Sequence, residues 1–489
     1  MSNKKAIRTD QLSFFTGFAI ITLASLLGAI YLEQYLIALV PVIVVLGYIS
    51  IVDFRIIFYL VLFCLPFSIQ YFFEGNTLAT DLPVEPLMVG LMFVFILYIL
   101  SRPDKIDPRF LFHPLIVILG IHYFWMIITT LNAEDMVVSL KFLLAKTWYI
   151  IVFVFVAGLI LKDQKTFRTA FWVLFIPLFV VTLLILARHA MLGFAYAEVN
   201  EAVMPIFRNH VNYSVHLTML LPFIWIAANW YEKGSFKRRF LIFCRAIFLV
   251  AIYFSYTRAC WVAILIALVA YAILNWGWLP FAVIASFLIT CVFFGYLSYQ
   301  NQFMQYAPEY RKTLTFEDFD EHIKATYQGQ DASTMERFYR WIAAFNMMDR
   351  NTLLGYGPGN FYPYYKEYTI LAFRTYISDN EDRSTVHNYF LLMLVEQGVI
   401  GMLIFVALFF SLFFYCQRLY NSIRERQDRL LATAAILSLA MFFVVLMLND
   451  LVEAAKTGTL FFMNIALLVN LDVKHRISKK NRESLTNSV

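Results

Sequence analysis

A histidine and two glycines mark one end of an apolar segment, in the stretch VHNYFLLMLVEQGVIG at residues 386–401. At about 100° per residue, a helix beginning at His387 would carry Gly398 and Gly401 close to the imidazole face. Small residues there let a neighbouring backbone approach closely. A neutral imidazole suits proton abstraction from a hydroxyl, and Asn388 could hydrogen-bond the ring or a substrate. The pattern indicates a general base at a helix mouth; the alternative is a histidine that caps or packs the helix.

A single arginine interrupts a long apolar run, LVAIYFSYTRACWVAILIALVA. Arg258 stands between two apolar segments with no room for a loop, so we expect it at the outer membrane surface. A charged side chain inside a membrane costs about 2.5–3.5 kcal/mol on insertion scales, so it usually faces a cavity or a partner. Its planar fork donates two hydrogen bonds to phosphate oxygens. The position favours an anion clamp for a diphosphate; the alternative is an arginine that reaches the lipid headgroups.

Further basic side chains are expected at the same surface. Arg208 precedes an apolar segment in PIFRNHVNYS, and Arg337 lies on a predicted amphipathic helix in MERFYRW. Trp341, four residues after Arg337, either offers a flat platform to a sugar ring or simply packs. Lys141 and Lys146 lie near the outer end of their segment, where they either line the same pocket or contact headgroups. Few carboxylates are expected beside these cations, which predicts an anionic substrate.

Membrane helices must position these residues. The chain has 489 residues, of which 61% are hydrophobic and 15% charged, whereas soluble domains are about half apolar and a quarter charged. Because a span needs about 20 apolar residues, we predict an all-α, polytopic transmembrane helical bundle of about twelve to fourteen spans. The segments are 12–31, 35–51, 56–73, 84–100, 110–131, 138–161, 169–187, 212–231, 240–257, 259–275, 278–298, 397–416, 430–448 and 457–472.

The distribution of charge predicts the orientation of the chain. Loops such as SRPDKIDPR, EKGSFKRR and QRLYNSIRERQDR are basic, and the loops that alternate with them are acidic or neutral. The positive-inside rule then puts both termini in the cytoplasm. The net charge of +6 does not indicate nucleic-acid binding, because the Lys and Arg residues are spread over short loops. The five cysteines form neither a disulfide framework nor a metal-binding spacing.

The same orientation divides the chain into three parts. Residues 1–298 form N-terminal transmembrane helices, residues 299–386 a large periplasmic loop, and residues 387–489 C-terminal helices with a basic cytoplasmic tail. The loop combines an amphipathic helix, STMERFYRWIAAFNMMDR, with a compact Gly- and Tyr-rich turn, LLGYGPGNFYPYY. This turn contains Gly355, Gly357 and Gly359.

Four blocks together resemble the O-antigen ligase and polymerase family. HNYFLLMLVEQGVIG fits the pattern H-N-x9-G-x-x-G, and STMERFYRWIAAFNMMDRNTLLGYGPGNF resembles the Arg…Trp…Leu-Gly-x-Gly-x-Gly-Asn-Phe block before it. YFSYTRACWVA is similar to the Ser-Arg-Gly-Ala helix junction, with Thr257 and Ala259 in place of the Ser and Gly. FRNHVNYSVHLTMLLP resembles a Gly-Asn-x-Asn-x-x-Ala helix start more loosely. The resemblance covers about residues 200–401.

The resemblance implies a ligase chemistry. Such enzymes move a glycan from undecaprenyl diphosphate to an acceptor sugar, such as that of lipid A–core, at the periplasmic face of the inner membrane. It implies that His387 is the base on the acceptor hydroxyl, that Arg258 and Arg337 hold the diphosphate, and that no metal or other cofactor is required. The expected substrate contacts are Arg208, Asn388, Trp341, Lys141 and Lys146, and the expected structural glycines are Gly355, Gly357, Gly359, Gly398 and Gly401.

Other functions stay open at this point. An O-antigen or exopolysaccharide polymerase and a protein O-oligosaccharyltransferase would use the same motifs. A metal-dependent glycosyltransferase would use an acidic pair such as Asp318 and Asp320. A transporter of lipid-linked glycans predicts internal repeats and charges at mid-membrane, and the sequence contains no internal repeat.

Overall fold

A computed structural model of the chain describes residues 2–72, 79–306, 332–374, 378, 385–453 and 455–486. These residues include ten helices that are long and apolar enough to cross a membrane, and a shorter apolar helix at Phe15–Tyr31. The predicted all-α, polytopic class is confirmed. The ten are fewer than the fourteen predicted segments for three reasons. Residues 35–67 count as one stretch, the helix at Phe15–Tyr31 is shorter than the others, and α11 and α19, defined below, carry more polar and charged residues.

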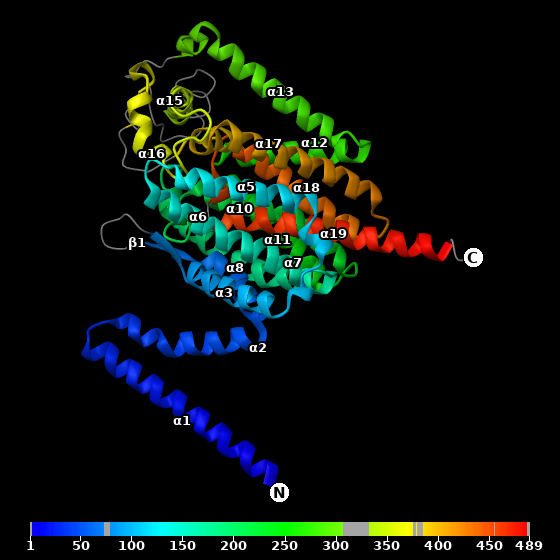
Figure 1. The fold of residues 1–489 in the computed structure, drawn as a ribbon. Coiled ribbons are helices and arrows are strands. Elements are labelled where there is room, and N and C mark those ends of the chain that lie inside the picture. Colours follow the sequence, from blue (N-terminus) through cyan, green and yellow to red (C-terminus); the bar gives the residue numbers. More distant parts are fainter. Residues whose placement is uncertain are drawn as a thin grey trace.

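The elements follow one another from a long first helix to a long last helix (Figure 1). Up to Trp230 they are α1 (Ser2–Tyr31), η1 (Tyr35–Leu39), α2 (Val40–Cys64), η2 (Leu65–Phe67), β1 (Ile69–Phe72), β2 (Ala79–Leu82), α3 (Val84–Ser101), η3 (Pro103–Lys105), α4 (Pro108–Leu111), α5 (Pro114–Leu131), α6 (Met136–Ile150), η4 (Ile151–Val156), α7 (Ala157–Ile160), α8 (Gln164–Met191), α9 (Val199–Val203), α10 (His210–Ala227) and η5 (Ala228–Trp230). They continue as α11 (Phe236–Phe254), α12 (Arg258–Trp276), α13 (Leu279–Ser298), η6 (Tyr299–Tyr306), α15 (Ala332–Met347), α16 (Phe361–Tyr364), η7 (Tyr365–Tyr368), η8 (Leu371–Phe373), α17 (Tyr389–Ser422), α18 (Arg426–Leu446), η9 (Leu451–Glu453) and α19 (Ala455–Thr486).

The helix α2 accounts for two of the predicted segments. Its backbone is non-helical at Asp53 (φ −154°, ψ 96°), so that α2 consists of two helical parts. These parts correspond to the predicted segments 35–51 and 56–73, but the second ends earlier than predicted. Residues 69–72 instead form β1, which pairs antiparallel with β2 in the register Ile69 with Leu82. The apolar residues here follow neither a helical nor a strand period, so the sequence could not distinguish this short strand from the end of a helix.

The bundle has a buried centre and a lipid-accessible edge. In the apolar windows of α10 and α18, 83% and 78% of the residues are buried inside the protein, compared with 11% for residues 35–67 and for α13. Large exposed side chains such as Leu36 and Ile51 lie on that edge. Figure 1 shows α1 and the start of α2 at one side of the helix bundle. The helices α10 and α18 therefore form the centre of the bundle, and we call them the central helices.

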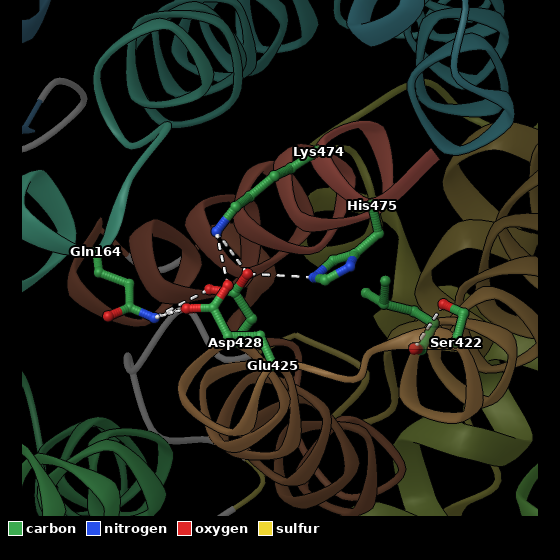
Figure 2. Close-up of polar contacts among 7 residues, drawn as sticks. Gln164, Ser422, Glu425, Asp428, Lys474 and His475 are labelled. Carbon is green, nitrogen blue, oxygen red and sulfur yellow. Dashed lines mark hydrogen bonds and ion pairs between the residues drawn. The ribbon is translucent and has the colours of Figure 1, made fainter. Parts of the chain in front are cut away.

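The two ends of the bundle carry different polar structures. Figure 1 shows α15 and α16 at one end, which we call the α15 end, and the C-terminal part of α19 at the opposite end. At that opposite end, the Asp428 carboxylate accepts hydrogen bonds from Gln164 Nε2 at 3.1 Å and from Lys474 Nζ at 2.6 Å, and it lies 3.1 Å from His475 Nε2 (Figure 2). These contacts join the starts of α8 and α18 to α19, and we call them the Asp428 network.

Candidate functional site

The helix α15 lies against the ends of α17 and α18. Arg337 Nε donates a hydrogen bond of 3.4 Å to the carbonyl oxygen of Leu448, just after α18. Arg340 Nη1 donates one of 3.1 Å to the carbonyl oxygen of Thr385, just before α17, and lies 3.4 Å from His387 Nε2. Arg337 and Arg340 therefore lie close to the residues just before α17 and just after α18.

The histidine precedes its helix instead of beginning it. His387 has a left-handed backbone (φ +57°), and α17 starts at Tyr389. Asn388 is the N-cap: its Oδ1 accepts hydrogen bonds from the N–H groups of Phe390 (3.0 Å) and Leu391 (3.1 Å), and its Nδ2 donates one of 3.1 Å to Met447. The prediction that the helix includes His387 and Asn388 is wrong, because the N-cap at Asn388 makes Tyr389 the first helical residue. Asn388 therefore caps α17 and links it to the residue that follows α18.

The surroundings of His387 favour a neutral imidazole. Burial lowers its pKa well below the usual 6.5, and the charges of Arg337 and Arg340 lower it further. The charged imidazolium is disfavoured both because water is excluded and because two like charges lie nearby. A neutral ring at pH 7 has a lone pair and is chemically suited to accept a proton.

Arg208 and Asp450 complete this polar group. Burial raises the pKa of Asp450, and the charges of Arg208 and Arg340 oppose that rise. Asp450 belongs to the connection between α18 and α19, and Arg208 to the loop before α10. We use the term arginine–histidine cluster for Arg208, Arg337, Arg340, His387 and Asp450, which come from four separate parts of the chain.

Arg258 is the first residue of α12. Thr257 is its N-cap residue, and a three-residue connection separates α12 from α11, where the sequence predicted no room for a loop. The hydroxyl of Thr257 donates a hydrogen bond of 3.5 Å to the carbonyl oxygen of His210, two residues after Arg208. The half-buried Arg258 thus lies at the same end of the bundle as Arg208.

The two predicted lysines differ in their surroundings. Lys146 is buried and forms an ion pair with Glu453, and its Nζ lies 3.2 Å from the hydroxyl of Tyr389. The same hydroxyl donates a hydrogen bond of 2.9 Å to Glu453. Lys141 is half-buried and, within the described part of the chain, forms no hydrogen bond or ion pair. Lys146 therefore connects α6 to the region after α18, whereas Lys141 lies at the partly exposed surface of α6.

Carboxylates accompany the arginines, contrary to the prediction. Glu336 pairs with Arg340 at 2.7 Å, Asp450 lies near Arg208 and Arg340, and Glu453 pairs with Lys146. The prediction considered only the neighbours in sequence, whereas Asp450 and Glu453 are brought in by the packing of α18 and α19. The α15 end is therefore a mixed-charge region with an excess of arginine.

The glycine-rich turn docks onto α17. The N–H groups of Tyr356 and Gly357 donate hydrogen bonds of 2.9 Å to the carbonyl oxygens of Val395 and Glu396. These acceptors are available because α17 is broken at Gly398 (φ +68°), where a Cβ atom would lie 2.1 Å from the carbonyl oxygen of Leu353. The predicted continuous helix from His387 to Gly401 is therefore wrong at Gly398, where the backbone of Leu353 approaches closely.

The remaining glycines seat the turn and the helix against their neighbours. A Cβ atom at Gly357 would lie 2.2 Å from the Cβ of Ala133, and one at Gly401 would lie 3.1 Å from the ring of Trp125 on α5. Trp125 also donates a hydrogen bond of 2.9 Å to the carbonyl oxygen of Gln397. Gly355 and Gly359 have left-handed backbones like Gly357.

Trp341 packs against a transmembrane helix. Its ring centroid is 5.3 Å from that of Phe294 on α13 and 5.6 Å from that of Phe338. Its indole Nε1 is buried and has no hydrogen-bond partner among the described residues. On the side that meets α13, Trp341 therefore packs against other rings, which is one of the two alternatives predicted for it.

Sequence reasoning missed Arg340 and Glu336, although a signal for both was present. Arg340 follows Arg337 by three residues and Glu336 by four, spacings that put all three on adjacent positions of a helix surface. The acidic pair Asp318 and Asp320 lies outside the described residues. Among the residues that the structure does describe, no group of three or more His, Cys, Asp or Glu side chains is arranged to hold a metal ion.

The central part of the chain is similar to one family of known proteins. Residues 243–406 match the family model described as O-antigen ligase. The matched range contains Arg258, Arg337 and His387, and it ends after Gly401. Arg208, Lys141 and Lys146 precede it. No curated protein matches the chain.

Proposed function

We propose that this chain, whose residues 243–406 belong to the O-antigen ligase and polymerase family, is an O-antigen ligase-type glycosyltransferase of the bacterial inner membrane. The family makes it a membrane enzyme that acts on lipid-linked glycans. The proposed donor is a glycan on undecaprenyl diphosphate, and the proposed acceptor is a sugar of lipid A–core or a similar glycolipid. The α15 end then faces the periplasm, with both termini in the cytoplasm.

The proposed reaction is a displacement at the anomeric carbon of the donor glycan. His387 accepts the proton of the acceptor hydroxyl as its oxygen bonds to that carbon. The bond between the anomeric carbon and the phosphate oxygen breaks, and undecaprenyl diphosphate leaves. Arg337, Arg258 and Arg208 stabilise the negative charge that develops on the leaving phosphate.

One observation carries this proposal: just before α17, His387 Nε2 lies 3.4 Å from Arg340 Nη1. Burial and the charges of Arg337 and Arg340 lower the pKa of His387, which favours the neutral imidazole. A base that must work at neutral pH needs an unprotonated lone pair, and a diphosphate leaving group needs positive charge. The arginines and His387 lie within one small region at the end of a membrane helix bundle, which supports both roles. Lys141, at the surface of α6, offers an additional contact to the anionic donor.

Deleting the gene and examining lipopolysaccharide by gel electrophoresis tests the proposal. Loss of a ligase leaves bare lipid A–core, whereas loss of a polymerase leaves core with a single repeat unit. The expected result is bare core in the deletion strain. The wild-type gene should restore the attached O-antigen, and a His387→Ala variant should not. A single-repeat band would instead identify a polymerase, and unchanged lipopolysaccharide with unmodified glycoproteins would identify a protein O-oligosaccharyltransferase.

Chelation tests the proposed metal independence. We expect the purified protein to transfer glycan at the same rate with and without an excess of EDTA, since the proposed roles belong to protein side chains. Loss of transfer that added Mg²⁺ or Mn²⁺ restores would favour a metal-dependent mechanism.

A further inference from the structure

Arg340 is held in place by a buried carboxylate. Its side chain is 4% exposed, and its Nε and Nη2 atoms lie 2.8 and 2.7 Å from Glu336 Oε1. The other oxygen of Glu336 accepts a hydrogen bond of 2.6 Å from the hydroxyl of Ser378. Glu336 is itself 6% exposed. One edge of the guanidinium is therefore fixed, and only Nη1 faces the residues before α17.

Nη1 contacts the nitrogen that a general base would use. It lies 3.4 Å from His387 Nε2 and 3.1 Å from the carbonyl oxygen of Thr385. A guanidinium has donors only, so a hydrogen bond between the two side chains requires Nε2 to accept. The ring proton is then on Nδ1, and the only lone pair of the imidazole points to Arg340. In this arrangement no nitrogen of His387 is free to accept the proton of a hydroxyl.

We propose that Arg340 is a positioning residue that masks the lone pair of His387 until the diphosphate of the donor draws Nη1 away. The inference rests on the proposed function and names how that site is regulated. The contact with His387 is the longest of those that Arg340 makes with polar atoms, so it is the one most easily exchanged. Phosphate oxygens are strong acceptors for a guanidinium. Nε and Nη2 keep Glu336 during the exchange.

The consequence is an order of events. The base becomes available only when a diphosphate is present, so an acceptor hydroxyl is not activated in an empty site. Arg337 and Arg258 hold the diphosphate in the proposed reaction, whereas Arg340 acts through His387.

Chemical modification of His387 tests the mask without requiring turnover. Diethyl pyrocarbonate acylates an unprotonated imidazole nitrogen, and mass spectrometry of the peptide that contains His387 separates it from the other seven of the eight histidines. At pH 8, where the ring is neutral, we expect Arg340→Gln in the full-length purified protein to be modified about ten-fold faster than wild type, the factor for losing a hydrogen bond to a charged group. Arg340→Lys, which keeps a charged donor, should be modified at an intermediate rate.

The matched control and a diphosphate arm complete the test. Arg350→Gln removes an exposed arginine that lies 5.9 Å above the ring of Tyr368, and it should leave the rate unchanged. Inorganic diphosphate should raise the rate in wild type toward that of Arg340→Gln. Equal rates in wild type and Arg340→Gln would overturn the mask, and no increase with diphosphate would overturn the release. Neither result depends on transfer activity, so a failure of the proposed function is seen separately in the lipopolysaccharide assay.

Discussion

The two ends of the helix bundle use charged residues in opposite ways. In the Asp428 network, one carboxylate lies within 3.1 Å of an amide, an ammonium and an imidazole (Figure 2). In the arginine–histidine cluster, an imidazole lies beside two arginines, and no carboxylate within the described residues hydrogen-bonds to it. The first arrangement joins opposite charges and locks helices together. The second has more arginines than carboxylates, with Glu336 paired to Arg340 and Asp450 nearby, and a bound anion would balance this excess of positive charge.

The surroundings of the titratable groups differ in the same way between the two ends. Asp163, at the start of α8 near the Asp428 network, has its pKa lowered, mainly by a backbone hydrogen bond from Thr166. At the α15 end, burial raises the pKa of Asp450 and lowers that of His387, so both groups are driven toward their neutral forms. Groups whose charged form is disfavoured gather at functional sites more often than at structural ones. The contrast supports the proposal that the α15 end binds a ligand and that the opposite end stabilises the fold.

Replacing one histidine at each end by alanine should give the largest difference in transfer between the two ends. His387→Ala should lower transfer by about 10²–10⁴-fold, the usual contribution of a general base. His475→Ala, which removes one contact of Asp428, should retain most of the activity. Complementation of a deletion strain, with membrane levels of both variants checked by immunoblot, measures the difference. Similar activities of the two variants would contradict the assignment of the base.

Arginine-to-lysine changes compare the two ends at constant charge. Arg258→Lys should lower transfer by about 10²–10³-fold, because an ammonium cannot replace the planar fork on a leaving diphosphate. Arg476→Lys is the matched change at the opposite end, where Arg476 Nε lies 2.6 Å from Asp472, and it should have little effect on transfer. Steady-state rates of the purified proteins give the ratio. A normal rate for Arg258→Lys would remove that residue from the site.

A glycine substitution tests whether the turn must dock onto α17. Gly398→Ala forces a side chain into a left-handed backbone and against the carbonyl oxygen of Leu353, at a cost of about 1–3 kcal/mol. Gly120→Ala is the control, since a Cβ atom at Gly120 has nothing within 4 Å. Thermal unfolding in detergent should show a lower Tm for Gly398→Ala alone. Equal Tm values would mean that the break in α17 is not needed.

Removing the charge of the Asp428 network should affect stability and not chemistry. Asp428→Asn weakens the contacts to Lys474 and His475, and because Lys474 is 42% exposed we expect a loss of only about 1 kcal/mol. Thermal unfolding measures the loss, and the transfer rate per folded molecule should stay unchanged. A variant of normal stability that transfers slowly would show that the Asp428 end also serves the reaction.

The pH dependence of transfer should report the arginines beside the base. Because the pKa of His387 is lowered, the imidazole stays neutral at pH 6.5, and the rate should decline only at more acidic pH. Arg340→Gln removes one of the charges that lower this pKa, so the acidic limb of the rate profile should move to higher pH. A limb that stays in place or moves to lower pH would contradict the electrostatic argument.

The sequence predicted the helical class and the residues of the matched blocks, but not how the blocks meet. Apolar runs and the Arg258 junction were readable because each depends on neighbours in sequence. The break at Gly398 was not, because it depends on the distant residues Leu353 and Thr352, which occupy the exposed backbone groups. The same holds for Lys146, whose partner Glu453 lies 307 residues away. Long-range pairs of this kind leave no local periodicity.

The most direct test of the central claim separates donor binding from transfer in purified His387→Ala. If the arginines hold the diphosphate and His387 supplies only the base, the variant should bind the undecaprenyl diphosphate-linked donor with wild-type affinity and transfer it at least about a hundred-fold more slowly. Near-normal transfer by this variant, or loss of donor binding in parallel with transfer, would contradict the account.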